Sequence, residues 1–353
     1  MAPALTPRRS VKRGGIIAMS RAWLEPRLTA AWQRDSRWLL PLRPLAALYG
    51  ALLHCRRTAA TLQADAPPLI VVGNITVGGS GKTPLLIAIA EQLRQSGWRP
   101  GIVSRGYGGR CSHYPLQVTA QTPAAECGDE PRLIANRTGL PVVVDPDRSR
   151  AVRHLQRCAD VDVVLSDDGL QHHAMARSVE IVVVDGERQF ANQRLLPAGP
   201  LREPLRRLES VDLVVVNGSQ HCPQAPHSHA MALQAQPLLA LNAAARSAAL
   251  TAGSRVHAVA AIGHPQRFAK TLHQLGFAVQ LQSAPDHATL TAAKLTFSDG
   301  EAVVVTEKDA VKLTPALCAE VANPLWALPI TAQLPALFWS RLDQLLGAAP
   351  SHQ

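Results

Sequence analysis

The chain has 353 residues, of which 47% are hydrophobic, and this length makes two domains with substantial cores the first expectation. Its six cysteines are scattered and form no Cys-x-x-Cys pair, which argues against a disulfide framework and against a zinc site. The net charge of +10 is concentrated in residues 1–66, where eleven basic and three acidic residues leave +8, so no nucleic-acid partner is expected.

The basic segment 1–66 combines positive charge with tryptophan and short apolar stretches. It holds three of the six tryptophans: Trp23, Trp32 and Trp38. The uncharged stretch 44–55 has only twelve residues, whereas a membrane-spanning helix needs roughly 20 apolar residues. Basic residues and tryptophan beside such stretches favour a segment that lies on the surface of an anionic membrane. The alternative is a helical cap whose apolar face packs on the following domain.

From residue 67 onward, short β-branched runs alternate with helical stretches, which is typical of an α/β fold with a parallel sheet covered on both faces. Strands are predicted at 69–73, 142–145, 161–166, 179–185 and 211–216, and helices at 84–96 and 147–158. A proline- and histidine-rich linker, 219–229, precedes a second series, with strands at 256–263, 277–282 and 302–309 and a helix at 266–275.

These patterns predict two α/β domains after the basic segment. The larger, residues 67–225, is expected to be of the phosphate-loop NTPase type because of the motif described next. The smaller, residues 226–353, is expected to be a second α/β unit. A cleft between two such domains is a natural place to bind two substrates.

The first predicted strand runs into a glycine-rich turn, "GNITVGGSGKTP" at residues 73–84. Apart from Thr76, which stands in place of the first glycine, the turn matches the phosphate-loop pattern G-x-x-x-x-G-K-[ST]. Its glycines allow consecutive backbone N–H groups to approach a polyphosphate at the N-terminus of the following helix. Lys82 is expected to reach the β- and γ-phosphates and Thr83 to reach Mg²⁺. The predicted nucleotide-binding residues are Thr76, Val77, Gly78, Gly79, Ser80, Gly81, Lys82 and Thr83.

Acidic residues suited to ordering Mg²⁺ follow two later strands. Asp167 and Asp168 follow the third predicted strand, and Asp185 and Glu187 lie at the end of the fourth, where we expect one acid to face the same site. The predicted metal-binding set is Thr83, Asp167, Asp168, Gln171 and Glu187. ATP is favoured over GTP, because no late strand is followed by the N/T-K-x-D element of guanine-specific proteins.

Seven short motifs are spread over the chain between about Trp38 and Trp339. They are "GNITVGGSGKTP" (73–84), "SRGYGG" (104–109), "GDEP" (128–131), "SDDGLQH" (166–172), "LLPAGPLREP" (195–204), "IGHPQRF" (262–268) and "TEKDAVK" (306–312). Their order and spacing resemble the tetraacyldisaccharide 4′-kinase family, the lipid A 4′-kinases of Gram-negative bacteria. The phosphate loop of that family also lacks the first glycine.

The resemblance implies a kinase that uses ATP and Mg²⁺. Members of the family transfer the γ-phosphate of ATP to the 4′-hydroxyl of an acylated glucosamine disaccharide 1-phosphate in lipid A biosynthesis. They act at the cytoplasmic face of the inner membrane. A peripheral attachment to the anionic membrane surface would account for the basic, tryptophan-bearing N-terminal segment.

The resemblance also implies roles for single residues. Asp129 of "GDEP" corresponds to the carboxylate that activates the 4′-hydroxyl, and His287 of "PDHATL" to its histidine partner. From the residues alone, Asp129 would instead be interpreted as a helix N-cap. The family usually has aromatic residues around that histidine, where this chain has Ala284 and Leu290, so His264 of "IGHPQRF" is the alternative partner.

Four further residues are implied in binding the sugar or the lipid phosphate: Ser104, Arg105, Tyr107 and Arg202. The "LREP" motif of Arg202 has a structural turn as its alternative.

Two other protein classes are alternatives to a kinase. A nucleotide-driven maturation or metal-insertion factor should lack the N-terminal segment and often carries a cysteine or histidine cluster. A non-catalytic membrane scaffold would not need Lys82, Thr83 and Asp168 in register.

Overall fold

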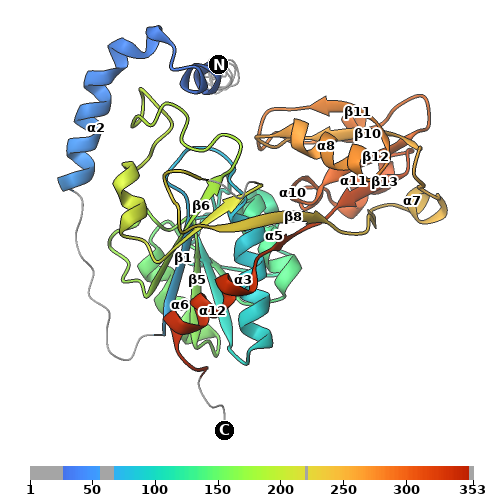
Figure 1. Cartoon of the computed structure of the whole chain (residues 1–353). Helices are drawn as coiled ribbons and strands as arrows, with labels where there is room; N and C mark the ends of the chain where they lie inside the picture. Colours follow the sequence, from blue (N-terminus) through green and yellow to red (C-terminus); the bar gives the residue numbers. More distant parts are fainter. Residues whose placement is uncertain (1–26, 56–66, 219–221, 350–353) are drawn as a thin grey trace, which may run out of the picture.

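The computed structural model describes residues 27–55, 67–218 and 222–349, which form an N-terminal helical segment and two α/β units (Figure 1). The larger sheet has the strand order β14-β8-β7-β6-β1-β5-β2-β4-β3. Its strands are β1 (Leu69–Gly73), β2 (Pro100–Ser104), β3 (Leu116–Val118), β4 (Val142–Val144), β5 (Val163–Asp167), β6 (Val179–Asp185), β7 (Leu213–Asn217), β8 (His229–Ala235) and β14 (Ile330–Gln333). The inner strands are parallel, and only the edge strands β14 and β3 pair antiparallel with their neighbours.

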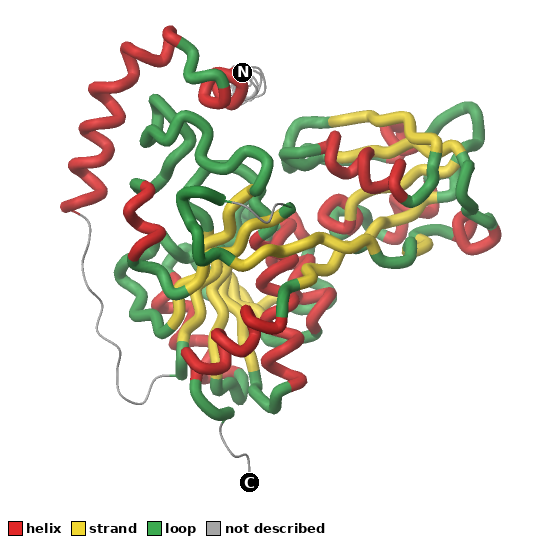
Figure 2. The backbone as a smooth tube through the Cα atoms, viewed as in Figure 1, coloured by secondary structure: helices red, strands yellow, loops and turns green. Residues whose placement is uncertain are grey.

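Helices cover both faces of the larger sheet, as its continuous apolar strands predict (Figure 2). One face is covered by α3 (Lys82–Gln95), α5 (Asp129–Thr138) and α12 (Ala336–Leu346), and the other by α6 (Arg148–Cys158) and the 3-10 helix η2 (Leu205–Glu209). A short helix, α4 (Ala124–Cys127), precedes α5. Successive side chains of β1 alternate between the two cores, with Ile70 and Val72 in one and Leu69 and Val71 in the other.

The parallel strands end together at one edge of the larger sheet. Gly73, Asp167, Asp185 and Asn217 are the last residues of β1, β5, β6 and β7. The register pairs Val72 with Asp167 and Asp185 with Asn217, while β6 continues three residues past Val182, the partner of Gly73. In open α/β sheets, ligands bind outside the carboxyl ends of the strands. The order β6-β1-β5 therefore puts the phosphate loop, which follows β1, between the two acidic strand ends.

The smaller sheet has the strand order β11-β10-β12-β13-β9 and a hydrophobic core on each face. Its strands are β9 (Leu239–Ala240), β10 (Arg255–Ala260), β11 (Ala278–Ser283), β12 (Ala302–Thr306) and β13 (Leu325–Leu328). Its helices are α7 (Ala243–Ser247), α8 (Pro265–Gln274), α9 (Ala292–Leu295), α10 (Glu307–Ala310) and α11 (Pro315–Glu320). All of its strands pair in parallel except β9.

The chain leaves the larger sheet through β8, forms the smaller sheet, and returns through β14 and α12 (Figure 1). A boundary at residue 226 would therefore separate β8 and β14 from the sheet that they share with β7. Of the predicted linker 219–229, residues 222–228 lie between strands and β8 begins at His229. The sequence signal of β8 is weak because six of its seven residues are half-buried or exposed.

The N-terminal segment is packed on the larger unit at one point and exposed at another. Residues 27–33 are helical and are followed by η1 (Arg37–Leu42) and α2 (Arg43–Cys55). Trp32 is buried and its Nε1 donates to Pro197 O at 3.1 Å. On α2, Leu45, Leu48 and Leu52 lie at helical spacing and are 54%, 59% and 50% exposed. Trp23 lies outside the described residues, and within them no helix has the length and apolar character to span a bilayer.

Candidate active site

The phosphate loop joins β1 to α3 and has an open, glycine-lined surface. Gly78 and Gly81 have φ values of 100° and 97°, in the left-handed region that glycine tolerates best. A Cβ built on Gly79 would meet nothing within 4 Å, so the backbone there is accessible to a ligand. Thr76 forms an isolated β-bridge with Leu201 and has no positive φ, which explains why glycine is not required at this position.

Two acids, the last residue of β5 and the residue after it, differ in their surroundings. The carboxylate of Asp167 is buried, its Oδ2 accepts from Ser104 Oγ at 3.2 Å, and its Oδ1 has no partner among the described residues. Burial raises the pKa of Asp167 to about 7, and the charges of Glu130 and Asp168 act in the same direction. An unpartnered buried carboxylate oxygen is a reason to expect a cation beside it.

Asp168 faces the phosphate loop and is held between two basic side chains. Its Oδ1 lies 3.7 Å from Lys82 Nζ, and its Oδ2 lies 3.0 Å from Arg202 Nη1. Burial acts to raise the pKa of Asp168, but Lys82 and Arg202 together bring it below its usual value, so this carboxylate is ionised at neutral pH. Its φ of 48° is unusual for a residue other than glycine and marks a tightly specified turn.

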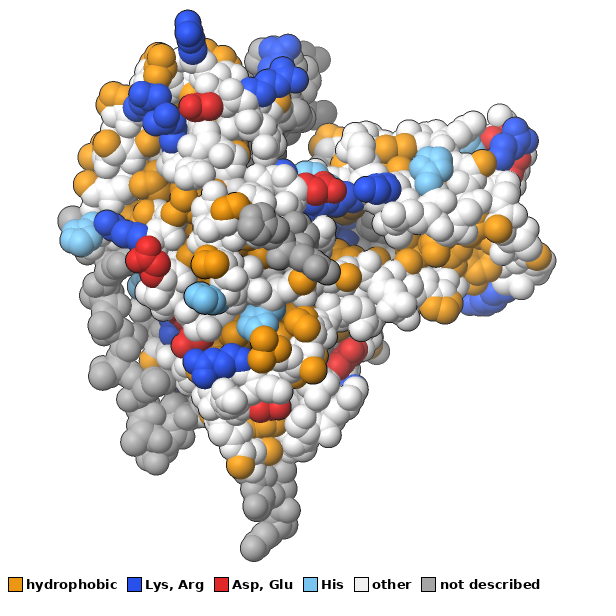
Figure 3. All heavy atoms as spheres, viewed as in Figure 1, with side chains coloured by type: hydrophobic (Ala, Val, Ile, Leu, Met, Phe, Trp, Pro, Cys, Tyr) orange, Lys and Arg blue, Asp and Glu red, His pale blue; other side chains and the backbone are white. Residues whose placement is uncertain are grey.

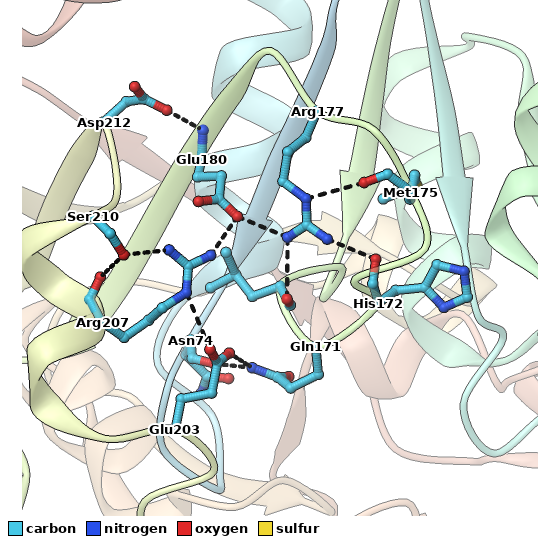
Figure 4. Close-up of polar contacts among 11 residues, drawn as sticks. Asn74, Gln171, His172, Met175, Arg177, Glu180, Glu203, Arg207, Ser210 and Asp212 are labelled. Carbon is cyan, nitrogen blue, oxygen red and sulfur yellow. Dashed lines mark hydrogen bonds and ion pairs between the residues drawn. The ribbon is translucent and has the colours of Figure 1, made fainter. Parts of the chain in front are cut away.

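Gln171 and Glu203 connect this acidic turn to the phosphate loop (Figure 4). Gln171 Nε2 donates to Asn74 O at 3.1 Å and to Glu203 Oε1 at 2.7 Å, while its Oε1 accepts from Arg202 Nη1 at 3.4 Å. The side chain predicted to bind metal is thus engaged by protein groups. In this arrangement it fixes the distance between the loop after β1 and the turn after β5.

A chain of ion pairs continues from Glu203 into the larger unit (Figure 4). Glu203 Oε2 accepts from Arg207 Nε at 3.1 Å, and Arg207 also contacts Glu180 on β6. Arg177 donates to Glu180 Oε1 at 2.7 Å and to three backbone carbonyls of the turn 170–175. Burial would raise the pKa of Glu180, but Arg207 and Arg177 lower it, so the network is charged and holds the turn that carries Asp168.

The two acids at the end of β6, Asp185 and Glu187, differ in exposure. Asp185, at the end of β6, is buried and accepts hydrogen bonds from Arg188 and from Arg267 of the smaller unit. Glu187 is 61% exposed at its side chain and its Oε2 lies 2.9 Å from Arg267 Nη2. The predicted metal candidate Glu187 therefore contacts the smaller unit.

Asp129 and His287 meet between the two units. Asp129 is the first residue of α5, and its Oδ2 lies 2.9 Å from Nδ1 of His287, which follows β11. Gly128 occupies the N-cap position, so the interpretation of Asp129 as a helix N-cap is wrong. The ring of Tyr107 stands edge-on to His287 with 5.5 Å between the ring centroids.

Lysine side chains of the "TEKDAVK" motif surround this pair. Lys312 Nζ lies 3.9 Å from Asp129 Oδ2 and 2.5 Å from Asp309 Oδ1. Lys308 Nζ lies 3.0 Å from Glu130 Oε1, next in sequence to Asp129. Both lysines come from the smaller unit and place positive charges beside carboxylates of α5.

His264, the alternative partner, lies elsewhere. It immediately precedes α8, and its Nε2 is buried without a hydrogen-bond partner among the described residues. Burial lowers the pKa of His264 to about 4; the charge of Arg188 acts in the same direction, and that of Asp185 acts against it. The geometry therefore brings His287, not His264, to Asp129.

The family model for Tetraacyldisaccharide-1-P 4′-kinase matches residues 38–347. The chain belongs to this family. The tetraacyldisaccharide 4′-kinase of Methylobacillus flagellatus is 46% identical over 88% of this chain and 92% of its own length. That of Pseudomonas aeruginosa is 45% identical over 91% of this chain and 98% of its own. The crystal structure of LpxK from Aquifex aeolicus in complex with ATP matches with a TM-score of 0.69 and 25% identity, over 88% of this chain and 100% of that one.

The candidate site also contains residues that the sequence patterns did not single out. Arg148 is buried, and its Nη2 donates to the carbonyl oxygens of Asp167 and Asp168 at 2.9 and 3.0 Å. Lys312 belongs to the "TEKDAVK" motif, for which the sequence predicts no role of its own. A long basic side chain near the start of a helix or in a loop is usually a surface charge, so neither residue carries a local signal.

The four residues predicted to bind the substrate occupy two kinds of position. Ser104 is buried against Asp167, and Arg202 pairs with Asp168. Arg105 and Tyr107 are exposed, with Tyr107 beside His287. Arg202 also donates its backbone N–H to Ile75 O at 2.7 Å, so the "LREP" turn has a structural contact with the phosphate-loop segment.

Proposed function

We propose that this kinase transfers the γ-phosphate of ATP to the 4′-hydroxyl of a tetraacyldisaccharide 1-phosphate in lipid A biosynthesis. The observation that carries the proposal is the contact of 2.9 Å between Asp129 and His287. It places a carboxylate–histidine pair between the two units of a chain that belongs to the tetraacyldisaccharide-1-P 4′-kinase family. Such a pair is suited to accept a proton from a sugar hydroxyl.

The donor side consists of the phosphate loop and the acids beside it. Backbone N–H groups of residues 76–83 would cradle the phosphates, and Lys82 would contact the β- and γ-phosphates. Thr83, Asp167 and Asp168 would hold Mg²⁺, which when bound neutralises charge on the β- and γ-phosphates. Magnesium sites of this kind use one or two carboxylates with phosphate oxygens and waters, so the buried free oxygen of Asp167 and the ionised Asp168 fit it.

The acceptor side uses Asp129 as the base and His287 as the group that orients it. When Nδ1–H of His287 donates to Asp129 Oδ2, the second carboxylate oxygen remains available for the 4′-hydroxyl proton. Lys312 Nζ, 3.9 Å from Oδ2, places a positive charge beside the carboxylate that would accept that proton. Because Asp129 and His287 belong to different units, their contact depends on the relative position of the units.

Arg105, Tyr107 and Arg202 would contact the sugar and its phosphate. Arg105 and Tyr107 are both exposed, and Tyr107 lies beside His287, where the acceptor would bind. Arg202 lies deeper, against Asp168. A planar guanidinium recognises phosphate through paired hydrogen bonds, which suits an anionic head group.

We further propose that the enzyme lies on the cytoplasmic face of the inner membrane. Leu45, Leu48 and Leu52 form an exposed apolar face on α2, and Figure 3 shows hydrophobic and basic side chains gathered over this helical segment. Tyr49, which borders this face on the same helix and is half-buried, donates through Oη to Arg202 O at 3.0 Å. This contact connects the proposed membrane-facing helix directly to a proposed substrate-binding loop.

The test is phosphoryl transfer from labelled ATP to lipid. Purified protein is incubated with ATP labelled at the γ-phosphate and a defined acylated disaccharide 1-phosphate in detergent. The proposal predicts label in a lipid product that carries the new phosphate at the 4′ position. Release of label only as inorganic phosphate would contradict it and would favour a nucleotide-driven factor without a small-molecule acceptor.

A further inference from the structure

Arg188 is a basic residue beside the phosphate loop that has no part in the mechanism above. It follows β6, on the opposite side of β1 from Asp168. Its Nη2 donates to Gly79 O at 2.8 Å, and its Nη1 lies 3.0 Å from the position of a Cβ built on Gly78. The guanidinium therefore lies on the arm of the loop that is farther from α3.

Asp185 fixes the direction of this guanidinium. Its Oδ2 accepts from Arg188 Nε at 3.3 Å and from Nη2 at 3.2 Å, and its Oδ1 accepts from the backbone N–H of Arg188 at 3.1 Å. The carboxylate is buried, whereas 22% of the Arg188 side chain remains exposed. Nη1 makes no hydrogen bond within the described residues, so its two donors remain available at the loop.

We infer that Arg188 is a further catalytic residue, which contacts the γ-phosphate and stabilises its charge during transfer; this inference depends on the proposed function. The end of a phosphate loop nearest its helix cradles the α- and β-phosphates, so the opposite arm, at Gly78 and Gly79, borders the γ-phosphate. An arginine supplied at this place by the same chain is a known means of accelerating phosphoryl transfer.

The transfer step shows what Arg188 would do. The 4′-oxygen forms a bond to the γ-phosphorus while the bond from that phosphorus to the bridging oxygen of the β-phosphate breaks. ADP leaves with the electron pair, and the hydroxyl proton passes to Asp129. Negative charge increases on the bridging oxygen and is spread over the oxygens of the transferring group, where Nη1 of Arg188 donates opposite Lys82.

The smaller unit reaches the same carboxylate. Arg267 on α8 donates through Nη2 to Asp185 Oδ1 at 2.7 Å and to Glu187 Oε2 at 2.9 Å. Burial acts to raise the pKa of Asp185, but Arg267 and Arg188 lower it, so the carboxylate is charged and able to hold both guanidinium groups. A change in the position of the smaller unit would therefore affect Arg188 on the ATP side of the site as well as Asp129 on the side of the acceptor hydroxyl.

The experiment separates a γ-phosphate contact from a role in holding the loop. Arg188→Ala, Arg188→Lys and the wild type are compared, with Arg255→Ala as a control because Arg255 lies on β10 with 70% of its side chain exposed. The turnover number is measured in the lipid assay. The dissociation constants of ADP and of a non-hydrolysable ATP analogue are measured with Mg²⁺ and without lipid.

The inference predicts a difference between the two nucleotides. Arg188→Ala should lose roughly 10³-fold or more in kcat. It should bind the ATP analogue at least about tenfold more weakly, whereas its affinity for ADP should stay within about twofold. Arg188→Lys keeps the charge but loses the planar fork, so its values should fall between those of Arg188→Ala and the wild type.

Two results would overturn the inference. Equal weakening of ADP and analogue binding would show that Arg188 only holds the phosphate loop, and kcat within about threefold of wild type in both variants would exclude a catalytic contact. If Arg188→Ala fails to fold, Arg188→Lys allows the same comparison. A wild-type protein that does not label lipid would contradict the proposed function, whereas the nucleotide affinities would still test the contact of Arg188.

Discussion

Replacing Lys82 with alanine removes the charge that links the phosphate loop to Asp168. Lys82 Nζ lies 3.7 Å from Asp168 Oδ1. At an effective dielectric constant of 20, two opposite unit charges at this distance attract each other by roughly 4 kcal/mol. Asp168 is 32% exposed at its side chain and keeps Arg202 as a partner, so we expect the free energy of unfolding to fall by only about 1 kcal/mol. Catalysis should suffer more, with kcat reduced roughly 10²-fold or more, because the lost charge is directed at the transferring phosphoryl group.

The assay measures kcat and KM for lipid phosphorylation, together with the free energy of unfolding by denaturant titration. Lys270→Ala is the matched control, because Lys270 is exposed on α8 and lies outside the proposed site. We expect the control to behave as wild type. Lys82→Ala should show a large decrease in kcat but only a small decrease in the free energy of unfolding. Activity of Lys82→Ala within about threefold of wild type would remove this loop from the mechanism.

Two further predictions concern the membrane and pH. Changing Leu45, Leu48 and Leu52 together to serine should weaken binding to anionic vesicles, because an exposed apolar face is lost. Deleting residues 1–40 should also weaken this binding, with a clear dependence on salt. If both variants bind vesicles as well as the wild type, the segment does not face the membrane. Burial lowers the pKa of His264 to about 4, so the folded state binds fewer protons than the unfolded state between that pH and about 6.5. We therefore expect the difference in the free energy of unfolding between the wild type and His264→Gln to change with pH: the wild type should lose stability relative to the variant as the pH falls from about 6.5 to about 4. A difference that does not depend on pH would show that His264 is not held neutral.

The sequence predicted the elements that have strong local patterns. The bounds of β1 and β6 are those expected from their apolar runs, and the phosphate loop follows β1 as its glycines and Lys82 indicate. β8, β14 and α12 were not predicted as parts of the larger sheet. β14 and α12 follow only after the smaller unit, and the pairing of β14 with β8, so distant in the sequence, leaves no periodic signal.

The site was predictable where a residue type and its local position suffice. Asp168 lies at the end of a buried strand, which is a local property of the sequence. The partnership of Asp129 with His287 has no local signal, because the two residues are 158 positions apart and belong to different units; only the family resemblance proposed it. Arg188 was not selected, because an arginine that follows an acidic strand end cannot be told from a surface charge until its contact with Gly79 is seen.

The pairing of Asp129 and His287 is the central claim, and a double-mutant comparison tests it most directly. The turnover number and the affinity for ATP are measured for Asp129→Ala, His287→Ala and the double variant, with His273→Ala, an exposed histidine of α8, as control. We expect each single change to reduce kcat strongly while leaving ATP affinity nearly unchanged, and the double variant to be little worse than the worse single variant, because residues that act as a unit are non-additive. Defects that multiply in the double variant, or a His287→Ala enzyme as active as the control, would contradict the account.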